Sequence, residues 1–183
     1  MKSKTKLIIL IAALVVVLAS AGIIYGILSL DGPTDKPGME YDPSAPDFTV
    51  LDTAGKPVQL KEMQGKPTVV NFWATWCGYC VMEMPSFDKL YKEYGDRVNF
   101  MMVDLCDGVQ ETQGKANAFI ATKGYTFPVY FDTDGTAQTA YQAYSIPLTV
   151  FVDQEGNLQA KHPGAMDEET LRYYIENLLG GNF

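Results

Sequence analysis

The most constraining feature of this chain is a pair of cysteines between an apolar run and an amphipathic run. Thr68 to Trp73 is almost wholly apolar and of strand length, which predicts a strand covered on both faces. Met82 to Tyr94 has apolar residues at helical spacing, and Gly95 follows as a C-terminal cap residue. We therefore expect Cys77 and Cys80 at the junction where a helix directly follows a buried strand.

A Cys-x-x-Cys at the first turn of a helix is typical of disulfide exchange, because the helix N-terminus stabilises a thiolate there. Cys77 is then the expected nucleophile, and Cys80, one turn on and buried behind it, the resolving thiol. A zinc half-site is an alternative, but Cys106 and His162 are the only other candidate ligands and have no fitting spacing. A structural disulfide is another, although so short a loop would stabilise little. We expect neither a metal nor a cofactor.

Composition narrows the class of protein further. Three cysteines are too few for a structural disulfide framework, and a length of 183 residues allows one ordinary domain with an appendage. The composition, 47% hydrophobic and 20% charged, is that of a globular protein. A formal net charge of −8 repels the phosphates of nucleic acids, so we expect no nucleic-acid partner.

Residues 7–30 form an uncharged apolar segment, longer than the roughly 20 residues that a helix needs to cross a bilayer core. Lysines precede this segment and aspartates follow it, which predicts a single pass through the cell membrane, with a cytoplasmic N-terminus and an extracytoplasmic C-terminal part. A signal peptide cleaved at the small residues 19–21 and a buried core helix are the alternatives. The apolar run continues past residue 21, which favours an uncleaved anchor in the lipid bilayer.

Composition shifts divide the chain into a cytoplasmic tip (1–6), the transmembrane anchor (7–30), a Pro/Gly-rich linker (31–46) and a folded domain (47–183). Two short apolar runs at 48–51 and 58–60 predict an N-terminal β-hairpin. Further patterns predict strands at 98–105, 129–131, 148–152 and 158–162, and helices at 113–123, 136–144 and 167–179. This order predicts a mixed α/β sheet covered on both faces.

Several stretches resemble one protein family in the same order along the chain. They are residues 69–80, then Glu83-Met84-Pro85, and then Ser145-Ile146-Pro147-Leu148-Thr149, and they are similar to the thioredoxin superfamily, in particular its membrane-tethered TlpA/ResA branch. The resemblance covers residues 47–179. It implies a thioredoxin fold, a central mixed β-sheet flanked by helices, here with an N-terminal β-hairpin extension, and the activity of a thiol-disulfide oxidoreductase.

The resemblance also indicates which residues would meet a substrate. Pro147 matches the family's cis-proline, whose bend would bring the backbone of Ile146 beside the sulfurs to pair with an extended substrate chain. Without the resemblance, an ordinary trans bond is the expectation at any proline. Trp76 would form an apolar wall beside the first cysteine. Gly78 and Tyr79, between the cysteines, complete the predicted substrate-binding set.

Proton transfer is expected to differ from that of cytoplasmic thioredoxins. These carry a buried aspartate six residues before the nucleophile, where this chain has Asn71. The TlpA/ResA branch resembles this chain in having asparagine there and a glutamate three residues after the second cysteine, which is Glu83. On a helix Glu83 can share a face with Cys80 and act as its general base, with a raised pKa if it is partly buried. An ordinary solvated glutamate is the alternative.

Cys106 follows the strand predicted at 98–105, at the rim of the sheet that the Cys77 turn should share. It is a candidate for an extra redox or resolving thiol. The alternative is an inert, partly buried cysteine, because a free cysteine commonly behaves as a small hydrophobic residue.

The prediction is therefore an extracytoplasmic reductase of disulfides in exported proteins, as in apocytochrome c maturation or the recycling of a methionine sulfoxide reductase. The resemblance implies electrons from a membrane dithiol carrier of the CcdA/DsbD type, and we expect a monomer. An oxidase or isomerase of the same fold stays open, because Gly78-Tyr79 replaces the usual dipeptide ending in proline and leaves the redox potential undetermined. A non-catalytic thioredoxin-like binding module is a further alternative. A peroxidase is disfavoured, because Thr75 is only two residues before Cys77 and the expected Thr-x-x-Cys is absent.

Overall fold

A mixed β-sheet forms the centre of the protein in the computed structural model, which describes residues 43–181. Within these residues the sheet has seven strands in the order β2-β1-β5-β4-β3-β6-β7. The strands are β1 (Thr49–Leu51), β2 (Pro57–Gln59), β3 (Thr68–Trp73), β4 (Asn99–Asp104), β5 (Val129–Phe131), β6 (Leu148–Val152) and β7 (Leu158–Pro163). The predicted hairpin is present, since β1 pairs antiparallel with β2.

Strand β3 is paired on both sides, in parallel with β4 and antiparallel with β6. All its side chains are buried, which explains its nearly unbroken apolar sequence. Because successive strand residues point to opposite faces, Val69 and Trp73 belong to one apolar cluster, and Val70 and Phe72 to the other. Asn71 lies two residues from both Val69 and Trp73 and therefore faces the same side of the sheet as they do.

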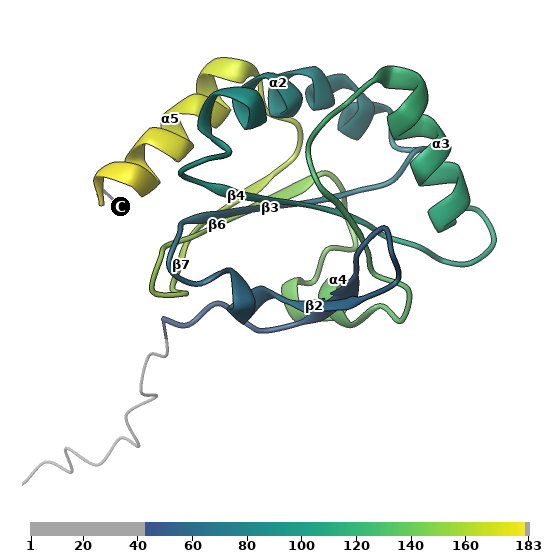
Figure 1. Ribbon diagram of the computed structural model, residues 1–183, viewed down its shortest axis with the longest axis horizontal. Coiled ribbons are helices and arrows are strands. Elements are labelled where there is room, and N and C mark those ends of the chain that lie inside the picture. Colours follow the sequence, from purple (N-terminus) through teal and green to yellow (C-terminus); the bar gives the residue numbers. More distant parts are fainter. Residues whose placement is uncertain (1–42, 182–183) are drawn as a thin grey trace, which may run out of the picture. The chain divides into compact units, whose positions relative to one another are not determined.

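Helices cover both faces of the sheet. They are α2 (Gly78–Tyr94), α3 (Gln113–Lys123), α4 (Thr136–Tyr141) and α5 (Glu168–Gly180), and a short 3₁₀ helix, η1 (Leu60–Met63), follows β2. Figure 1 shows α2, α3 and α5 on one side of the sheet and α4 on the other. The two apolar clusters agree with this division: buried residues of α2, α3 and α5 belong to one cluster, and those of α4 to the other.

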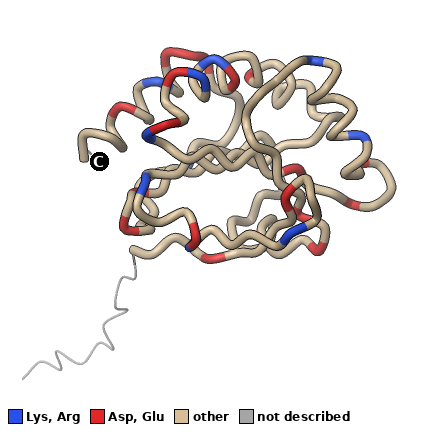
Figure 2. Tube along the Cα trace, viewed as in Figure 1, with Lys and Arg blue, Asp and Glu red and all other residues tan. Residues whose placement is uncertain are grey.

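Helices α2 and α5 are joined across their surface by ion pairs. Arg172 of α5 bonds both carboxylate oxygens of Glu93 on α2, and Lys89 of α2 bonds Glu168 of α5. Acidic and basic residues accordingly lie together along this helix pair (Figure 2). Because exposed ion pairs each contribute only about 0–1 kcal/mol, the apolar faces beneath them must hold these helices to the sheet.

Most predicted elements were confirmed, some with different ends. Helix α3 and strands β3, β5 and β6 occupy the predicted ranges. Helix α2 begins before the predicted start at Met82, because the sulfur of Cys77 caps it by accepting a hydrogen bond from the N–H of Cys80. Helix α4 ends at Tyr141 because Gln142 adopts a left-handed conformation with φ 56°.

Residues 43–46, which lie in the predicted linker, are hydrogen-bonded to the hairpin of β6 and β7. The backbone N–H of Ala45 donates to Gly156 O, and that of Leu158 donates to Pro43 O. Residues 43–46, predicted as the end of the linker, therefore belong to the compact unit that begins at Pro43. A proline-rich stretch can still bond a neighbouring hairpin through its carbonyls and its remaining N–H groups, which the composition alone did not reveal.

Among residues 43–181, no helix combines the length and the hydropathy that a membrane crossing requires. The predicted anchor at 7–30 and most of the predicted linker lie outside the described residues. These assignments stay predictions.

The buried face of α2 can be tested by truncating Phe87, which is fully buried in the cluster between α2 and the sheet. Phe87→Ala should lower the free energy of unfolding by about 3–5 kcal/mol, measured by denaturant titration, because it leaves a cavity. Tyr173→Ala on the exposed side of α5 is the matched control and should cost less than about 1 kcal/mol. Equal losses in the two variants would contradict the described packing.

Candidate active site

The Cys77–Cys80 disulfide lies where the chain leaves β3 and enters α2. The two sulfurs are 2.06 Å apart and the two Cα atoms 5.2 Å apart. Cys80 is 0% exposed, whereas Cys77 retains 6% exposure. Cys77 is thus the sulfur that a substrate disulfide can reach, which agrees with its predicted role as nucleophile and with Cys80 as the resolving thiol.

Two backbone groups flank the sulfur of Cys77. The N–H of Cys80 donates to it over 3.1 Å, and the carbonyl oxygen of Ile146 lies 3.6 Å away. In the disulfide form the latter is a contact only, whereas a reduced Cys77 thiol can donate to this carbonyl. The Ile146–Pro147 peptide bond is cis, as the resemblance implied. The predicted substrate-pairing backbone of Ile146 therefore does lie beside the reactive sulfur.

Aromatic side chains next to the cysteines are largely exposed. Trp76 and Tyr79 are 53% and 69% exposed, and Tyr144, just before the Ile146 turn, is 70% exposed. Gly78 is also exposed, whereas Pro147 is buried. Exposed aromatic residues beside a reachable sulfur fit the predicted binding of a polypeptide, because such residues dominate protein interfaces.

Glu83 is buried on the face of α2 that packs against β3, with 2% exposure. Its Oε1 accepts a hydrogen bond from Asn71 Nδ2 at 2.8 Å, and its Oε2 accepts one from the backbone N–H of Met166 at 2.8 Å. Asn71 Nδ2 also donates to Thr149 Oγ1 at 3.0 Å. Glu83, the predicted general base, is therefore in direct contact with Asn71, and it is three residues from Cys80 along one helix.

The protonation of Glu83 depends on its surroundings. Burial raises the pKa of Glu83 to about 7, and the hydrogen bonds from Met166 and Asn71 lower it only in part. A carboxyl group with this pKa can both accept and return a proton near neutral pH, as a general acid-base requires. The alternative of an ordinary solvated glutamate does not fit this burial.

Two partners in this network were not foreseen from the sequence. Thr149 follows the recognised Pro147 turn, and its hydroxyl helps to orient the amide of Asn71. Met166 contributes only a backbone N–H from the loop between β7 and α5, so its side-chain type carried no signal.

Cys106 lies just after β4 and its thiol donates to Asp104 Oδ1 at 3.0 Å. Burial raises the pKa of the Cys106 thiol, and the carboxylates of Asp104, Glu111 and Asp132 raise it further. Because the thiolate is the nucleophile, these surroundings favour the inert alternative over an extra redox thiol. Within residues 43–181, no three His, Cys, Asp or Glu side chains are arranged to hold a metal ion.

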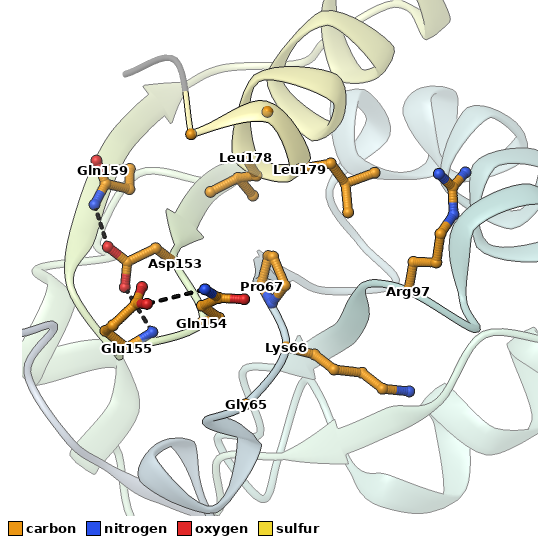
Figure 3. Close-up of a pocket in the computed structure, with 12 residues that line it drawn as sticks. Gly65, Lys66, Pro67, Arg97, Asp153, Gln154, Glu155, Gln159, Leu178 and Leu179 are labelled. Atoms are coloured by element: carbon orange, nitrogen blue, oxygen red, sulfur yellow. Dashed lines mark hydrogen bonds between the residues drawn. The ribbon is translucent and has the colours of Figure 1, made fainter.

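A cavity of about 540 Å³ lies at the other end of β3, where Lys66 and Pro67 precede the strand. Figure 3 shows Asp153 in its wall, hydrogen-bonded to Gln159. Strand β3 separates this cavity from the cysteines by about 20 Å, so it cannot be part of the reacting site. A smaller cavity, of about 160 Å³, adjoins Trp76 at the cysteine end.

Comparison with known proteins agrees with this geometry. The model of the AhpC/TSA family matches residues 42–161. The chain belongs to this family. The thioredoxin-like protein YneN of Bacillus subtilis is 32% identical over 139 residues, which are 76% of this chain and 81% of YneN. The thiol-disulfide oxidoreductase ResA of Geobacillus kaustophilus is 31% identical over 179 residues, which are 97% of this chain and 99% of ResA.

Several solved structures that resemble this protein are also described as thiol-disulfide oxidoreductases or thioredoxins. A putative thiol:disulfide interchange protein DsbE from Chlorobium tepidum superposes with a TM-score of 0.67 and 28% identity, over 75% of this chain and 96% of that protein. The predicted membership of the thioredoxin superfamily, as a TlpA/ResA-like protein with a mixed α/β thioredoxin fold, is therefore confirmed. The protein is a thiol-disulfide oxidoreductase.

The buried state of Glu83 predicts a pH-dependent stability. Because its pKa rises from an ordinary 4.5 to about 7 in the folded protein, the folded state keeps this proton after the unfolded chain has lost it. The associated stability is full below the unfolded pKa and is lost as the pH rises through the folded pKa. Relative to Glu83→Gln, the wild type should lose up to about 3 kcal/mol of unfolding free energy across this window.

Denaturant titrations of both proteins at a series of pH values measure this difference. Asp104, whose pKa burial also raises to about 7, titrates in both proteins and so cancels in the comparison. Parallel stability curves for wild type and Glu83→Gln would show that folding leaves the pKa of Glu83 unchanged and would refute the described surroundings.

Proposed function

We propose that the protein reduces disulfides of exported proteins at the outer face of the cell membrane. The thiolate of Cys77 attacks one substrate sulfur, forms a mixed disulfide and releases the other substrate sulfur as a thiolate. Cys80 gives its proton to Glu83 and attacks the sulfur of Cys77. The substrate leaves with both sulfurs reduced, two electrons have moved to it, and Cys77 and Cys80 are left as the disulfide.

The observation that carries this proposal is Glu83, buried on the same helix face as Cys80 with a pKa near neutrality. A fully buried thiol cannot lose its proton directly to water, so resolution of the mixed disulfide needs a nearby base. We take reduction as the direction because the TlpA/ResA branch, which this chain resembles, is mostly reducing.

The location rests on the apolar residues 7–30 and the lysines before them. The similarity to ResA of Geobacillus kaustophilus extends over 97% of this chain, so the relative has a counterpart of this segment. A reducing domain outside the membrane needs electrons from inside, and a membrane dithiol carrier of the CcdA/DsbD type is the proposed donor. Apocytochrome c and a methionine sulfoxide reductase are the proposed substrates.

The redox potential of the Cys77–Cys80 pair tests the direction of the reaction. We expect a redox potential of about −270 mV, as for reducing members of the fold. Strong oxidants have a potential of about −120 mV. Equilibration of the full-length protein with dithiothreitol or glutathione buffers, followed by alkylation and mass spectrometry, measures it. A Cys106→Ala variant is tested in parallel, so that alkylation of the third thiol does not contribute to the measured ratio of reduced to oxidised protein. A value near that of the oxidants would overturn the reductase proposal.

Trapping tests the substrate class. Full-length Cys80→Ala protein cannot resolve a mixed disulfide, so its physiological partners should stay bound to Cys77 in its own cell. Exported proteins with paired cysteines should be recovered after non-reducing electrophoresis, and a Cys77→Ala/Cys80→Ala protein, the matched control, should capture none. If the Cys80→Ala protein captures no more than this control, the proposed reaction with exported proteins is wrong.

A further inference from the structure

A buried carboxylate outside the Cys77–Cys80–Glu83 set contacts the turn that leads to the nucleophile. Glu111 is 0% exposed, and its Oε2 accepts two hydrogen bonds from Thr75. The Thr75 backbone N–H donates over 2.9 Å, and the Thr75 hydroxyl over 2.6 Å. We call these two hydrogen bonds the Thr75 clamp.

The loop that carries Glu111 is itself held in one conformation. Asp107 Oδ1 accepts hydrogen bonds from the N–H groups of Val109 and Glu111, both at 2.8 Å. The N–H groups of Asp107 and Gly108 donate to the carbonyl oxygen of Glu111, at 3.1 and 3.0 Å. The loop therefore presents the Glu111 carboxylate from a fixed backbone, immediately before helix α3.

The position of Thr75 makes this contact relevant to the reaction. Trp73 ends β3, and its carbonyl oxygen accepts a hydrogen bond from Leu105 N at 3.0 Å. Cys77 N donates to Ala74 O at 3.1 Å and closes the turn before α2. The Thr75 clamp therefore fixes the middle of a turn whose two ends are the sheet and the nucleophile, and whose next residue is the exposed Trp76.

Burial of the Glu111 charge is costly. None of the ion pairs in the described part of the chain involves Glu111, and its Oε1 has no hydrogen-bond partner there. A buried carboxylate compensated only by neutral donors disfavours folding compared with a neutral side chain of the same shape. A carboxylate at position 111, buried in spite of this cost, fits a role as the hydrogen-bond acceptor that fixes the active-site turn.

We propose that Glu111 is a positioning residue, which holds the turn through Thr75 so that Cys77 and Trp76 keep the geometry required for attack on a substrate disulfide. The proposal rests on disulfide exchange at Cys77 and does not depend on its direction, because a misplaced nucleophile slows the forward and reverse reactions alike. The pocket beside Trp76, lined by Cys106 and Asp107, adjoins this loop.

Four variants of the full-length protein separate the clamp from general stability. Glu111→Ala removes the acceptor, and Glu111→Gln keeps an amide oxygen that can accept both hydrogen bonds without the charge. Thr75→Val removes only the hydroxyl donor, and Thr75→Ser restores it. The readout is kcat/KM for reduction of insulin disulfides, with dithiothreitol as reductant, together with the rate constant of the first attack on dithiobis(nitrobenzoate).

A matched control exists elsewhere in the molecule. Asp88 Oδ1 on α2 accepts hydrogen bonds from both the backbone N–H and the hydroxyl of Thr126, at 2.6 and 2.9 Å. This pair has the same two donor groups as the Thr75 clamp but does not contact the active-site turn, and Asp88 differs from Glu111 in that it also forms an ion pair with Lys92. Asp88→Ala should therefore lower the melting temperature and leave the rate constants unchanged.

We expect Glu111→Ala to lower both rate constants by about tenfold or more at a temperature well below its melting transition. Glu111→Gln and Thr75→Ser should stay within about threefold of wild type, and Thr75→Val should be intermediate. If Glu111→Ala does not fold, the Thr75→Val and Thr75→Ser pair decides the question.

Wild-type rates in folded Glu111→Ala, equal losses in Glu111→Gln and Glu111→Ala, or equal losses in Asp88→Ala would each overturn the proposal. If instead the reducing function is wrong, the pair will have an oxidising potential while the order of the variants stays the same. The two failures are therefore distinguishable.

Discussion

The pairing of β3 with both β4 and β6 is the constraint on which the active site depends. Because its neighbours fix it in register, alternate residues of β3 must face opposite sides of the sheet. Asn71 is thereby turned toward α2, where it meets Glu83, and the strand ends at the turn that carries Cys77. Cys80, one turn into α2, is then covered by the same apolar cluster that includes Trp73. The pairing of the strands thus determines that a substrate can reach the sulfur of Cys77 and that the sulfur of Cys80 is buried.

Burial of Glu83 opposes ionisation more strongly than its two hydrogen bonds favour it, and this balance leaves its pKa near neutrality. An amide at position 71 suits this arrangement, because Asn71 donates to the carboxylate without adding a second acid beside it. We propose that Glu83 carries the proton here, whereas cytoplasmic thioredoxins are expected to use a buried aspartate at the position of Asn71. Glu111 shows a second use of a buried carboxylate, as an acceptor that fixes a backbone turn at Thr75.

Local patterns predicted much of this structure. The apolar run at β3 and the helical spacing after it placed Cys77 and Cys80 at the strand-helix junction, and the spacing from Cys80 to Glu83 placed the acid on the same helix. The contact of Ile146 with Cys77, between segments distant in sequence, was predicted from the family resemblance and not from a local pattern, and other contacts of this kind could not be predicted. The Met166 N–H bonds Glu83 through a loop whose side chains carry no signal, and Glu111 stands in a polar loop that has no periodicity to indicate burial. Tertiary packing alone brings these groups to the site.

The rate at which Cys80 resolves the mixed disulfide tests the central claim most directly. When reduced protein reacts with dithiobis(nitrobenzoate), Cys77 releases the first thionitrobenzoate and the attack of Cys80 releases the second, so stopped-flow absorbance separates the two steps. The second rate constant should rise as the pH passes through about 7, the pKa of Glu83. In Glu83→Gln it should fall by about a hundredfold and lose this inflection. An unchanged rate and pH profile in Glu83→Gln would contradict the assignment of Glu83 as the base for Cys80.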